Sequence, residues 1–329
     1  MVCLRASVGY SIAGYCRLAD MGLAAFLLVA LSSGCSVTQQ SPRAACLQAA
    51  LEQPGLRNGV AAYSVGGEDT QLVASNMRGW FRLASGRRYS AASLTKVRVA
   101  YRVRLMVERG DVNLDQSLNS LLSNGDIWVD ELDGVTIRGL LQHTSGAPPA
   151  DRADPFFYRP GDEAPHPNCA AAVRQISSGS ARWWSSGITR YSNVGYCLLG
   201  EVLLAKMADG SLLDSDLRSV LLSPMGAAGG WADTLGGIHA GLRQSLPLSQ
   251  LALDGTPLPD GSWYTFGWRY WPDSAAGARW THTGRLQGFL AVALTDGEQR
   301  LLVAHFDGDP VDYHAAAAQF GRQSWPCMR

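Results

Sequence analysis

The strongest constraint on the fold is that the spacing of apolar residues changes twice along the chain. Alternating segments typical of strands occur over residues 60–74 and again over residues 264–305. Between them, from about residue 111 to residue 225, apolar residues recur at helical spacing. We therefore predict one α/β (α+β) domain. Its antiparallel sheet is built from both chain ends, is flanked by terminal helices and carries an inserted helical subdomain.

The boundaries of the elements follow from these patterns and from turn and cap residues. The predicted strands are residues 60–64, 71–74, 264–270, 279–283, 289–294 and 301–305. The predicted helices are residues 46–52, 93–109, 114–122, 137–142, 170–176, 194–207 and 313–323. The first and the last of these are the helices that we expect to flank the sheet.

The N-terminal segment has the composition of an export signal. Residues 21–34 are apolar or small, and the stretch is too short to cross a bilayer. Arg17 and Asp20 prevent it from extending upstream as one apolar helix. We predict three segments: a signal peptide over residues 1–35, a tether over residues 36–45 and a single domain over residues 46–327.

Cys35 ends the run Ser32-Ser33-Gly34-Cys35, which resembles the lipobox of bacterial lipoproteins. Lipidation of Cys35 would attach the protein to a membrane, whereas ordinary cleavage near Gly34 would release it. The residues alone leave both outcomes open. In either case we expect an exported bacterial protein, periplasmic or membrane-anchored, in an oxidising compartment.

The cysteines support this location. Cys3 and Cys16 would leave with the signal, and Cys35 would carry the lipid. The cysteines that remain are Cys46, Cys169, Cys197 and Cys327. They allow three pairings, and four buried thiols are the alternative. We predict a Cys46–Cys327 disulfide that ties the chain ends together and a Cys169–Cys197 disulfide that brackets the loop around Tyr191.

Charged residues are balanced in number but not in type. The chain has 28 basic and 28 acidic residues and no long run of one sign, which disfavours a nucleic-acid partner. Only Lys96 and Lys206 are lysines; every other basic residue is arginine. Because arginine does not lose its proton in proteins, a lysine in such a chain indicates a chemical need for an amine.

The first motif is Ser93-Leu94-Thr95-Lys96, at the start of the predicted helix 93–109. Residues three apart on a helix share one face, so the Lys96 amine lies beside the Ser93 hydroxyl. A neutral amine can accept the hydroxyl proton, and the positive end of the helix favours the alkoxide that forms. Lys206 has no such context and is predicted to be a solvated surface residue.

The second motif is Tyr191-Ser192-Asn193, in a loop before the predicted helix 194–207. A phenol close to a lysine can act as a general acid or base, and an amide can hold both the lysine and a substrate carbonyl. The alternative is an ordinary loop tyrosine followed by a turn asparagine.

The third motif is His282-Thr283-Gly284, at the end of a predicted strand. Glycine would let a substrate backbone pair along the strand edge, and His282 would add a donor near the substrate or Tyr191. The backbone N–H groups of Arg285 and Ser93 could form an oxyanion hole. The Arg285 side chain either binds a substrate carboxylate or points into solvent. By chance, the three motifs in this order are expected in about one such chain in a thousand.

These motifs resemble those of the serine β-lactamase-related family, in the branch of class C β-lactamases, D,D-peptidases and related esterases. The resemblance covers nearly all of the mature chain. It extends to residues 81–85 before Ser93 and to residues 108–111, 136–146 and 222–226. The run His282 to Phe289 is similar to that of a D,D-peptidase. Arg285 departs from the pattern, because small residues are usual there.

The resemblance implies a β-lactamase or penicillin-binding-protein-like fold and acylation of Ser93. It assigns Lys96 and Tyr191 to the base system, Asn193 to the acyl side, and residues 282–284 to the strand beside the substrate. The implied activity is hydrolysis of an amide or ester through an acyl-enzyme. The substrate would be a D-amino-acid peptide of the cell wall, a β-lactam or a small ester. The alternative is a penicillin- or peptide-binding sensor of the same fold that does not turn over.

Other catalytic arrangements are disfavoured. His143 and Ser145 are two residues apart after a predicted helix and are interpreted as structural. The sequence has no Gly-x-Ser-x-Gly elbow, no His-Glu-x-x-His and no close cysteine pair, so neither a metal nor a cofactor is predicted. We expect a monomer that takes a small-molecule or peptide substrate.

Overall fold

The computed structural model describes residues 41–122, 132–148, 169–177, 186–208, 210, 214–248 and 257–329. The predicted signal peptide and the lipidation candidate Cys35 lie outside these residues. Within the described residues, no helix combines the length and apolarity needed to cross a membrane.

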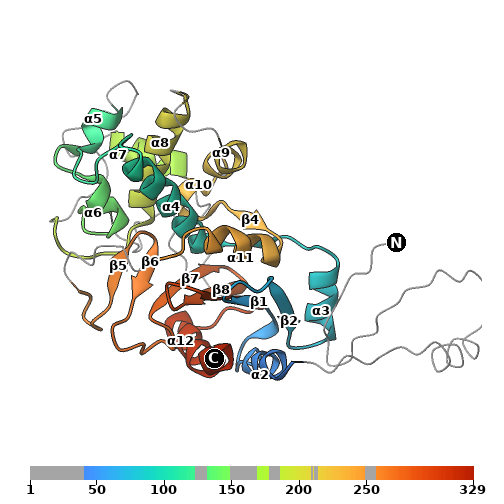
Figure 1. The fold of residues 1–329 in the computed structure, drawn as a ribbon. Coiled ribbons are helices and arrows are strands. Elements are labelled where there is room, and N and C mark those ends of the chain that lie inside the picture. The colour runs from blue at the N-terminus through green and yellow to red at the C-terminus, as the bar shows by residue number, and fades with distance from the viewer. Residues whose placement is uncertain are drawn as a thin grey trace, which may run out of the picture.

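A seven-stranded antiparallel sheet forms the centre of the structure (Figure 1). In spatial order its strands are β2 (Gln71–Ala74), β1 (Arg57–Val65), β9 (Arg300–Asp307), β8 (Phe289–Thr295), β7 (Trp280–Leu286), β6 (Trp268–Tyr270) and β5 (Trp263–Thr265). The two chain ends join where β1 pairs with β9, for example at Tyr63 opposite Leu302. The predicted sheet from both chain ends is confirmed.

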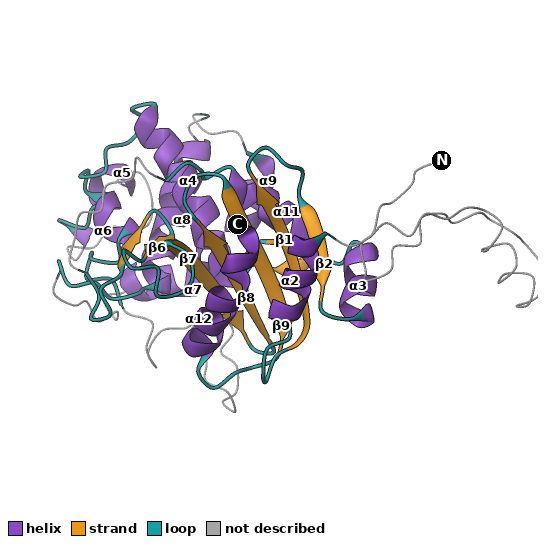
Figure 2. Cartoon of the chain, turned by 60° about the horizontal axis from the view of Figure 1, so that its bottom comes forward, coloured by secondary structure: helices purple, strands orange, loops and turns teal. Residues whose placement is uncertain are grey.

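Helices cover both faces of the sheet. The terminal helices α2 (Pro42–Ala50) and α12 (Tyr313–Ser324) pack together on one face, with the short 3₁₀ helix η3 (Trp325–Met328). On the other face lie α11 (Leu235–Arg243) and α4 (Thr95–Glu108) (Figures 1 and 2). This layering follows from the alternation in β9, where Leu301 and Val303 belong to one core and Leu302 to the other.

The helical part lies beyond α4, at one end of the sheet (Figure 1). Its helices are α5 (Leu118–Leu122), α6 (Ile137–Leu141), α7 (Cys169–Ser177), α8 (Asn193–Ala208), α9 (Ser215–Leu221) and α10 (Gly226–Gly229). The buried helix α8 is packed against α5, α6, α7, α9 and α10. A two-stranded sheet of β3 (Tyr89–Ser90) and β4 (Ala232–Asp233) connects this part to the chain before Ser93.

Several predicted boundaries differ from the structure. The predicted helix 114–122 is shorter, because α5 begins only at Leu118. Helix α2 begins at Pro42, inside the predicted tether 36–45, because Ser41 accepts the Ala44 N–H and proline suits the first helical turn. The predicted helix 93–109 is a 3₁₀ turn, η1 (Ala92–Leu94), followed by α4.

A further difference is at residues 264–270, which form a hairpin rather than one strand. Phe266 and Gly267 connect β5 to β6 with φ values of +44° and +80°. Positive φ at both central residues is typical of a tight two-residue turn, and glycine is usual there. A Cβ at Gly267 would lie 2.7 Å from the backbone oxygen of Lys96, so the turn packs closely against α4.

Both disulfides are present with the predicted pairing. Cys46–Cys327 joins α2 to η3 at the two ends of the described chain. Cys169–Cys197 joins α7 to α8, the helix that begins at Asn193.

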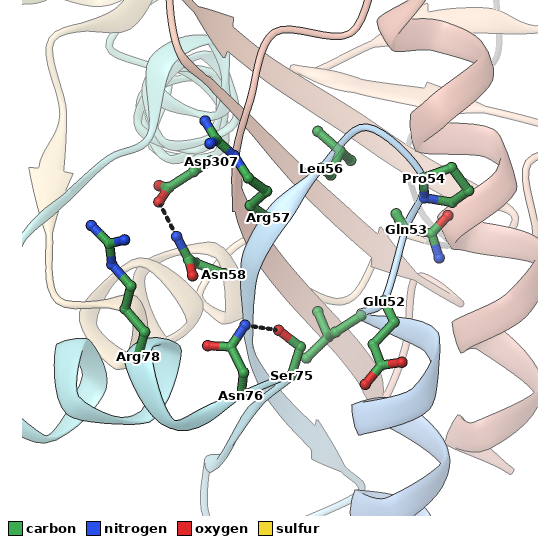
Figure 3. Close-up of a pocket in the computed structure, with 11 residues that line it drawn as sticks. Glu52, Gln53, Pro54, Leu56, Arg57, Asn58, Ser75, Asn76, Arg78 and Asp307 are labelled. Carbon is green, nitrogen blue, oxygen red and sulfur yellow. Dashed lines mark hydrogen bonds between the residues drawn. The ribbon is translucent and has the colours of Figure 1, made fainter.

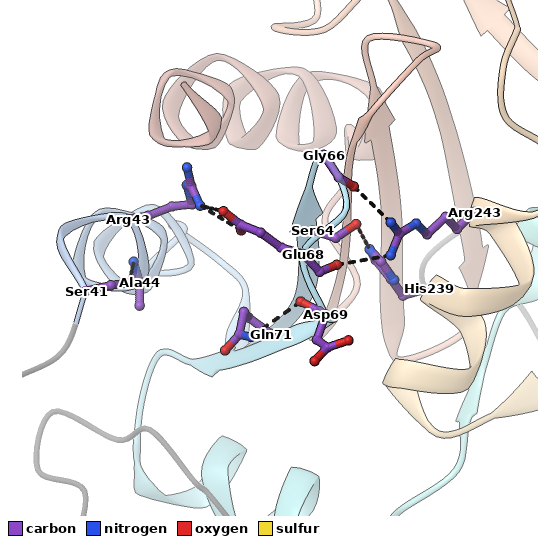
Figure 4. Close-up of polar contacts among 10 residues, drawn as sticks. All are labelled: Ser41, Arg43, Ala44, Ser64, Gly66, Glu68, Asp69, Gln71, His239 and Arg243. Carbon is purple, nitrogen blue, oxygen red and sulfur yellow. Dashed lines mark hydrogen bonds and ion pairs between the residues drawn. The ribbon is translucent and has the colours of Figure 1, made fainter. Parts of the chain in front are cut away.

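The turn between β1 and β2 holds helices on both sides of the sheet (Figure 4). Arg243 of α11 donates hydrogen bonds to the backbone oxygens of Gly66 and Glu68, at 2.9 and 3.1 Å. The Glu68 carboxylate forms an ion pair with Arg43 of α2 at 3.1 Å. His239 of α11 lies 3.2 Å from the Ser64 hydroxyl. These bonds fix the edge of the sheet that is farthest from the strands β5 and β6.

Candidate active site

Ser93 lies in η1, directly before α4. Ala92 has a φ of +42°, a left-handed conformation that turns the chain sharply before the serine. The turn is held by two backbone bonds, from Ala91 N–H to the Trp231 oxygen at 2.8 Å and from Leu94 N–H to the Ala91 oxygen at 3.0 Å. Ser93 remains partly exposed at the positive end of α4.

Lys96 is fully buried, and its amine is surrounded by oxygen atoms. Nζ lies 2.8 Å from Asn193 Oδ1, 2.7 Å from the Ala228 backbone oxygen and 3.1 Å from Ser93 Oγ. The first two oxygens carry no proton, so each takes an N–H from the amine. The remaining position on the nitrogen points toward Ser93. It carries an N–H when Lys96 is a charged ammonium and the lone pair when Lys96 is a neutral amine. The amine can therefore either donate to Ser93 or accept its proton.

Tyr191 reaches the same serine from the loop before α8. Its hydroxyl makes a side-chain hydrogen bond with Ser93. Burial raises the pKa of Tyr191 well above its usual value. The phenol is therefore protonated in the resting protein and can donate a hydrogen bond. Its ring centroid lies 5.1 Å from Lys96 Nζ, so the amine is positioned over the face of the phenol ring.

His143 holds the backbone on both sides of Tyr191. Its Nδ1 accepts the Ser192 N–H at 3.1 Å, and its backbone oxygen accepts the Arg190 N–H at 2.8 Å. The imidazole is also packed on the Tyr191 ring, with centroids 4.5 Å apart. Burial, and then the charge of Lys96, hold the pKa of His143 well below its usual value, so the ring is neutral and can accept through Nδ1. His143 thus has a structural role, as the sequence predicted, and this role includes holding the candidate catalytic residue Tyr191 in position.

Two further tyrosines border the site and are not singled out by the sequence. Tyr264 of β5 lies with its ring 4.9 Å from His143 and 5.5 Å from Tyr191. Burial raises the pKa of Tyr264 to about 12. Tyr196 lies with its ring 5.3 Å from His143. No sequence pattern marks Tyr264, because it reaches the site only through the β5–β6 hairpin. Tyr196 stands three residues after Asn193, and that helical spacing is the signal that could have found it.

Strand β7 brings the third motif next to Ser93. It pairs along its whole length with β8, but with β6 only at Trp280 and Thr281. From His282 onward, the backbone edge of β7 that faces β6 therefore makes no strand pairing with β6. A Cβ on Gly284 would lie 2.3 Å from the Ala91 oxygen and 3.2 Å from the Ser93 nitrogen, so only glycine allows this approach.

His282 is 4% exposed and points to the same side as Gly284. Its ring centroid lies 6.4 Å from that of Tyr191. Neither ring nitrogen has a hydrogen-bond partner among the described residues. Burial, and then the charges of Lys96 and Arg269, lower the pKa of His282 to about 3. His282 is therefore a neutral ring with donor and acceptor capacity that the protein itself does not use.

Thr283 and Arg285 lie on the opposite face of β7, toward α12. The Arg285 guanidinium forms an ion pair with Asp309 at 2.8 Å and lies 5.0 Å from the Tyr313 ring centroid. The Arg285 side chain is thus not directed into solvent, and its positive charge is already paired with Asp309. A substrate carboxylate would have to compete with Asp309 for it.

A cavity of about 450 Å³ begins at His282 and Thr283 and extends along α12. Its polar and aromatic lining includes Tyr264, Arg269 and His314. The described residues contain no group of side chains arranged to hold a metal ion.

The structure thus brings Ser93, Lys96, Tyr191, Asn193, His282 and Gly284 together and leaves the side chains of Thr283 and Arg285 on the far face of β7. The arrangement joins a nucleophile, an amine, a phenol and an unpaired strand edge, as acyl transfer requires.

The chain is similar to known proteins in sequence and in fold. The sequence model of the family described as Beta-lactamase matches residues 44–232. No curated protein sequence matches the chain.

Three solved structures are similar to the chain. D-amino acid amidase from Ochrobactrum anthropi SV3, complexed with L-phenylalanine, has a TM-score of 0.64 and 17% identity over 87% of this chain and 98% of that chain. D-stereospecific amidohydrolase from Streptomyces sp. has a TM-score of 0.55 and 20% identity over 82% and 95%. The octameric penicillin-binding protein homologue from Pyrococcus abyssi has a TM-score of 0.55 and 15% identity over 83% and 74%. Identities this low show a shared fold.

Proposed function

The chain belongs to the beta-lactamase family, a family of serine hydrolases, and from this premise we propose that it hydrolyses an amide bond through an acyl-enzyme on Ser93. The observation that carries the proposal is the 3.1 Å contact between Lys96 Nζ and Ser93 Oγ at the start of α4. A buried amine and a partly exposed hydroxyl at this distance form a nucleophile and its base.

Acylation moves one proton from Ser93 to the leaving group. Lys96, in its neutral form, takes the hydroxyl proton as Oγ bonds to the substrate carbonyl carbon. Tyr191, whose raised pKa keeps it protonated, gives its proton to the leaving nitrogen as the C–N bond breaks. The Lys96 ammonium then returns a proton to Tyr191, which restores both groups.

Deacylation reverses these roles. Tyr191 takes a proton from a water molecule and passes its own to the neutral Lys96 amine as the water oxygen attacks the acyl carbon. The Lys96 ammonium then gives a proton to Ser93 Oγ as the ester bond breaks. The N–H groups of Ser93 and Arg285 would stabilise the negative oxygen in both halves. This role is supported by the approach of Gly284 to the Ser93 nitrogen.

For the substrate we propose an amide or short peptide whose acyl residue is a D-amino acid. Two similar structures are a D-amino acid amidase and a D-stereospecific amidohydrolase, which supports this class. The part of the substrate beyond the scissile bond would extend past His282 and Tyr264 into the cavity along α12, whose lining does not include Ser93. The two unpaired nitrogens of His282 would bind a polar group of the substrate there.

Active-site labelling tests the nucleophile. We expect a fluorophosphonate and a fluorescent penicillin to label Ser93, as mapped by mass spectrometry of peptides. Turnover of D-phenylalanine amide, compared with its L-isomer, a p-nitrophenyl ester and nitrocefin, then ranks the substrates. A label on another residue would contradict the proposal. Labelling of Ser93 without turnover of any substrate would instead favour the binding sensor.

Lys96→Arg tests the base while keeping the charge. We expect acylation of Ser93 to slow by about 10³-fold or more, because guanidinium cannot accept a proton. Lys206→Arg in α8 is the matched control and is expected to stay within about twofold of the unaltered protein. Acylation of Lys96→Arg at a rate close to that of Lys206→Arg would refute the role of Lys96.

A further inference from the structure

Helix α3 (Met77–Ala84) exposes its apolar side to solvent. Met77 and Phe81, one helical turn apart, are 54% and 64% exposed, and Ala84 continues the same face. The opposite side of the helix is packed through Gly79, where an added Cβ would lie 3.1 Å from Val60 and 3.3 Å from Ala74. The core side of α3 is thus made by Gly79 together with Trp80 and Leu83, whereas Met77 and Phe81 remain exposed and contribute little to the packing.

Arginines surround this apolar face. Arg78 lies on α3 itself, and Arg57 lies across a cavity of about 610 Å³ at the start of β1 (Figure 3). Arg87 and Arg88 follow the helix, and all four side chains are exposed. Within the described part of the chain, none of the four takes part in an ion pair.

Two carboxylates face the same surface. Asp307 is already paired with Arg82 at 2.6 Å and accepts a bond from Asn58 at 2.8 Å. Glu52 is therefore the one acidic side chain in the lining of the cavity that is not committed to these partners. The surface around α3 carries a net positive charge next to exposed apolar side chains.

We propose that this face of α3, with Arg57, Arg78, Arg87 and Arg88, docks on an anionic phospholipid surface. Met77 and Phe81 would enter the headgroup region, and the guanidinium groups would bind lipid phosphates. This combination of a short apolar face with flanking cations is complementary to such a membrane.

The position of α3 is compatible with attachment at the N-terminus. Both α3 and α2 are packed against β2, the edge strand of the sheet, and α3 lies at the margin of the molecule (Figures 1 and 2). The segment from the lipidation candidate Cys35 to Ser41, the cap of α2, spans at most about 20 Å. A lipid on Cys35 would hold the domain within that reach of a bilayer, and α3 would then orient it.

Vesicle binding tests the proposal. The predicted mature chain from residue 36 onward, which lacks both the apolar residues 21–34 and the lipidation candidate Cys35, is sedimented with vesicles of phosphatidylglycerol or of phosphatidylcholine. We expect binding to phosphatidylglycerol that weakens with salt, and at least about tenfold weaker binding after Met77→Ser/Phe81→Ser. Val311→Ser removes another exposed apolar residue, 90% exposed near α12, and is the matched control. It should bind as the parent does.

Two results would overturn the proposal. The first is equal binding by the parent and the α3 variant. The second is dimerisation of the parent without lipid that Met77→Ser/Phe81→Ser abolishes, because the face would then join two copies of the chain. An unchanged far-ultraviolet circular dichroism spectrum and unchanged urea unfolding show that the variants are folded, and they keep this test independent of the proposed hydrolysis.

Discussion

At the scale of single residues, the geometry of the site depends on how tightly its polar side chains are held in place. Lys96 is fully buried, and its amine is held by Asn193 and the Ala228 backbone so that its third direction faces Ser93. Tyr191 is held less firmly on its own side chain, by its contact with Ser93 and by the packing of its ring on His143. Its place is determined by His143, which bonds to the residues on either side of it.

Substitution of His143 should therefore affect chemistry more than binding. In His143→Ala the Ser192 N–H loses its acceptor, and alanine tolerates the φ of +60° at this position poorly. We expect kcat to fall by about 10²-fold through misplacement of Tyr191, with a much smaller change in KM. His143→Asn should recover much of the loss, because asparagine offers an acceptor oxygen and adopts positive φ readily. Steady-state kinetics on the best substrate measures both.

Ser145→Ala is the control for His143. The Ser145 hydroxyl accepts the Ala147 N–H within its own loop, so its removal should change kcat by no more than a few-fold. Loss of Ser93 labelling in Ser145→Ala would revive His143 and Ser145 as a separate nucleophile pair.

Gly284 makes a second residue-scale prediction. A methyl group there would lie 2.3 Å from the Ala91 oxygen, so Gly284→Ala must push β7 away from η1. We expect acylation of Ser93 to slow by about 10²-fold or more, because the oxyanion-hole donors separate. Gly67→Ala has no atom within 4 Å of its added Cβ and should leave the rate unchanged. Equal rates for the two variants would show that β7 does not form the site as proposed.

At the scale of elements, the sequence predicted those contacts that depend only on the spacing of residues within one helix or strand. Ser93 and Lys96 are three residues apart at a helix start, so their contact follows from the sequence alone. Helix α3 was not predicted, because its apolar residues do not form one face: Trp80 and Leu83 pack on the core, whereas Met77 and Phe81 face solvent. The β5–β6 hairpin was predicted as one strand, because Phe266 stands where asparagine or aspartate would mark the turn. The contacts of Tyr264 depend on that hairpin and could not be foreseen without it.

The two disulfides should stabilise the elements they join to different extents. Cys169 and Cys197 are 28 residues apart, and Cys46 and Cys327 are 281 apart. In the chain-entropy description, the shorter loop contributes about 3–4 kcal/mol and the longer about 5 kcal/mol to the free energy of unfolding. Urea unfolding of Cys169→Ala/Cys197→Ala and of Cys46→Ala/Cys327→Ala compares them. A larger loss for the shorter loop would mean that native-state packing, rather than chain entropy, dominates.

At the scale of the whole molecule, buried histidines recur on the side of the sheet that carries the site. His143 and His282 border Ser93, His305 is stacked on Phe289 with its ring edge-on to Tyr89, and His239 joins α11 to β1 at Ser64 (Figure 4). Burial lowers the pKa of each: to about 3 for His282 and His305, to about 4 for His239, and well below the usual value for His143. All four are neutral in the folded protein at neutral pH.

This shared property predicts unfolding in mild acid. In the unfolded chain the histidines have a pKa of about 6.5, so below that pH the unfolded state binds more protons than the folded state. Stability is therefore complete above about pH 6.5 and is lost as the pH falls toward the folded pKa values. With up to four protons involved, the loss approaches about 5 kcal/mol per pH unit, and a protein of ordinary stability should unfold near pH 5.

Urea unfolding measured between pH 7.5 and pH 5 tests this slope. The lowered pKa values of Asp296 and Asp307 contribute only as the pH approaches their ordinary value near 4, so carboxylates cannot mimic the effect above pH 5. His239→Gln should reduce the slope by about one proton, whatever its effect on stability at neutral pH, because glutamine does not titrate. A free energy of unfolding that stays constant from pH 7 to pH 5 would mean that these imidazoles take up protons in the folded state.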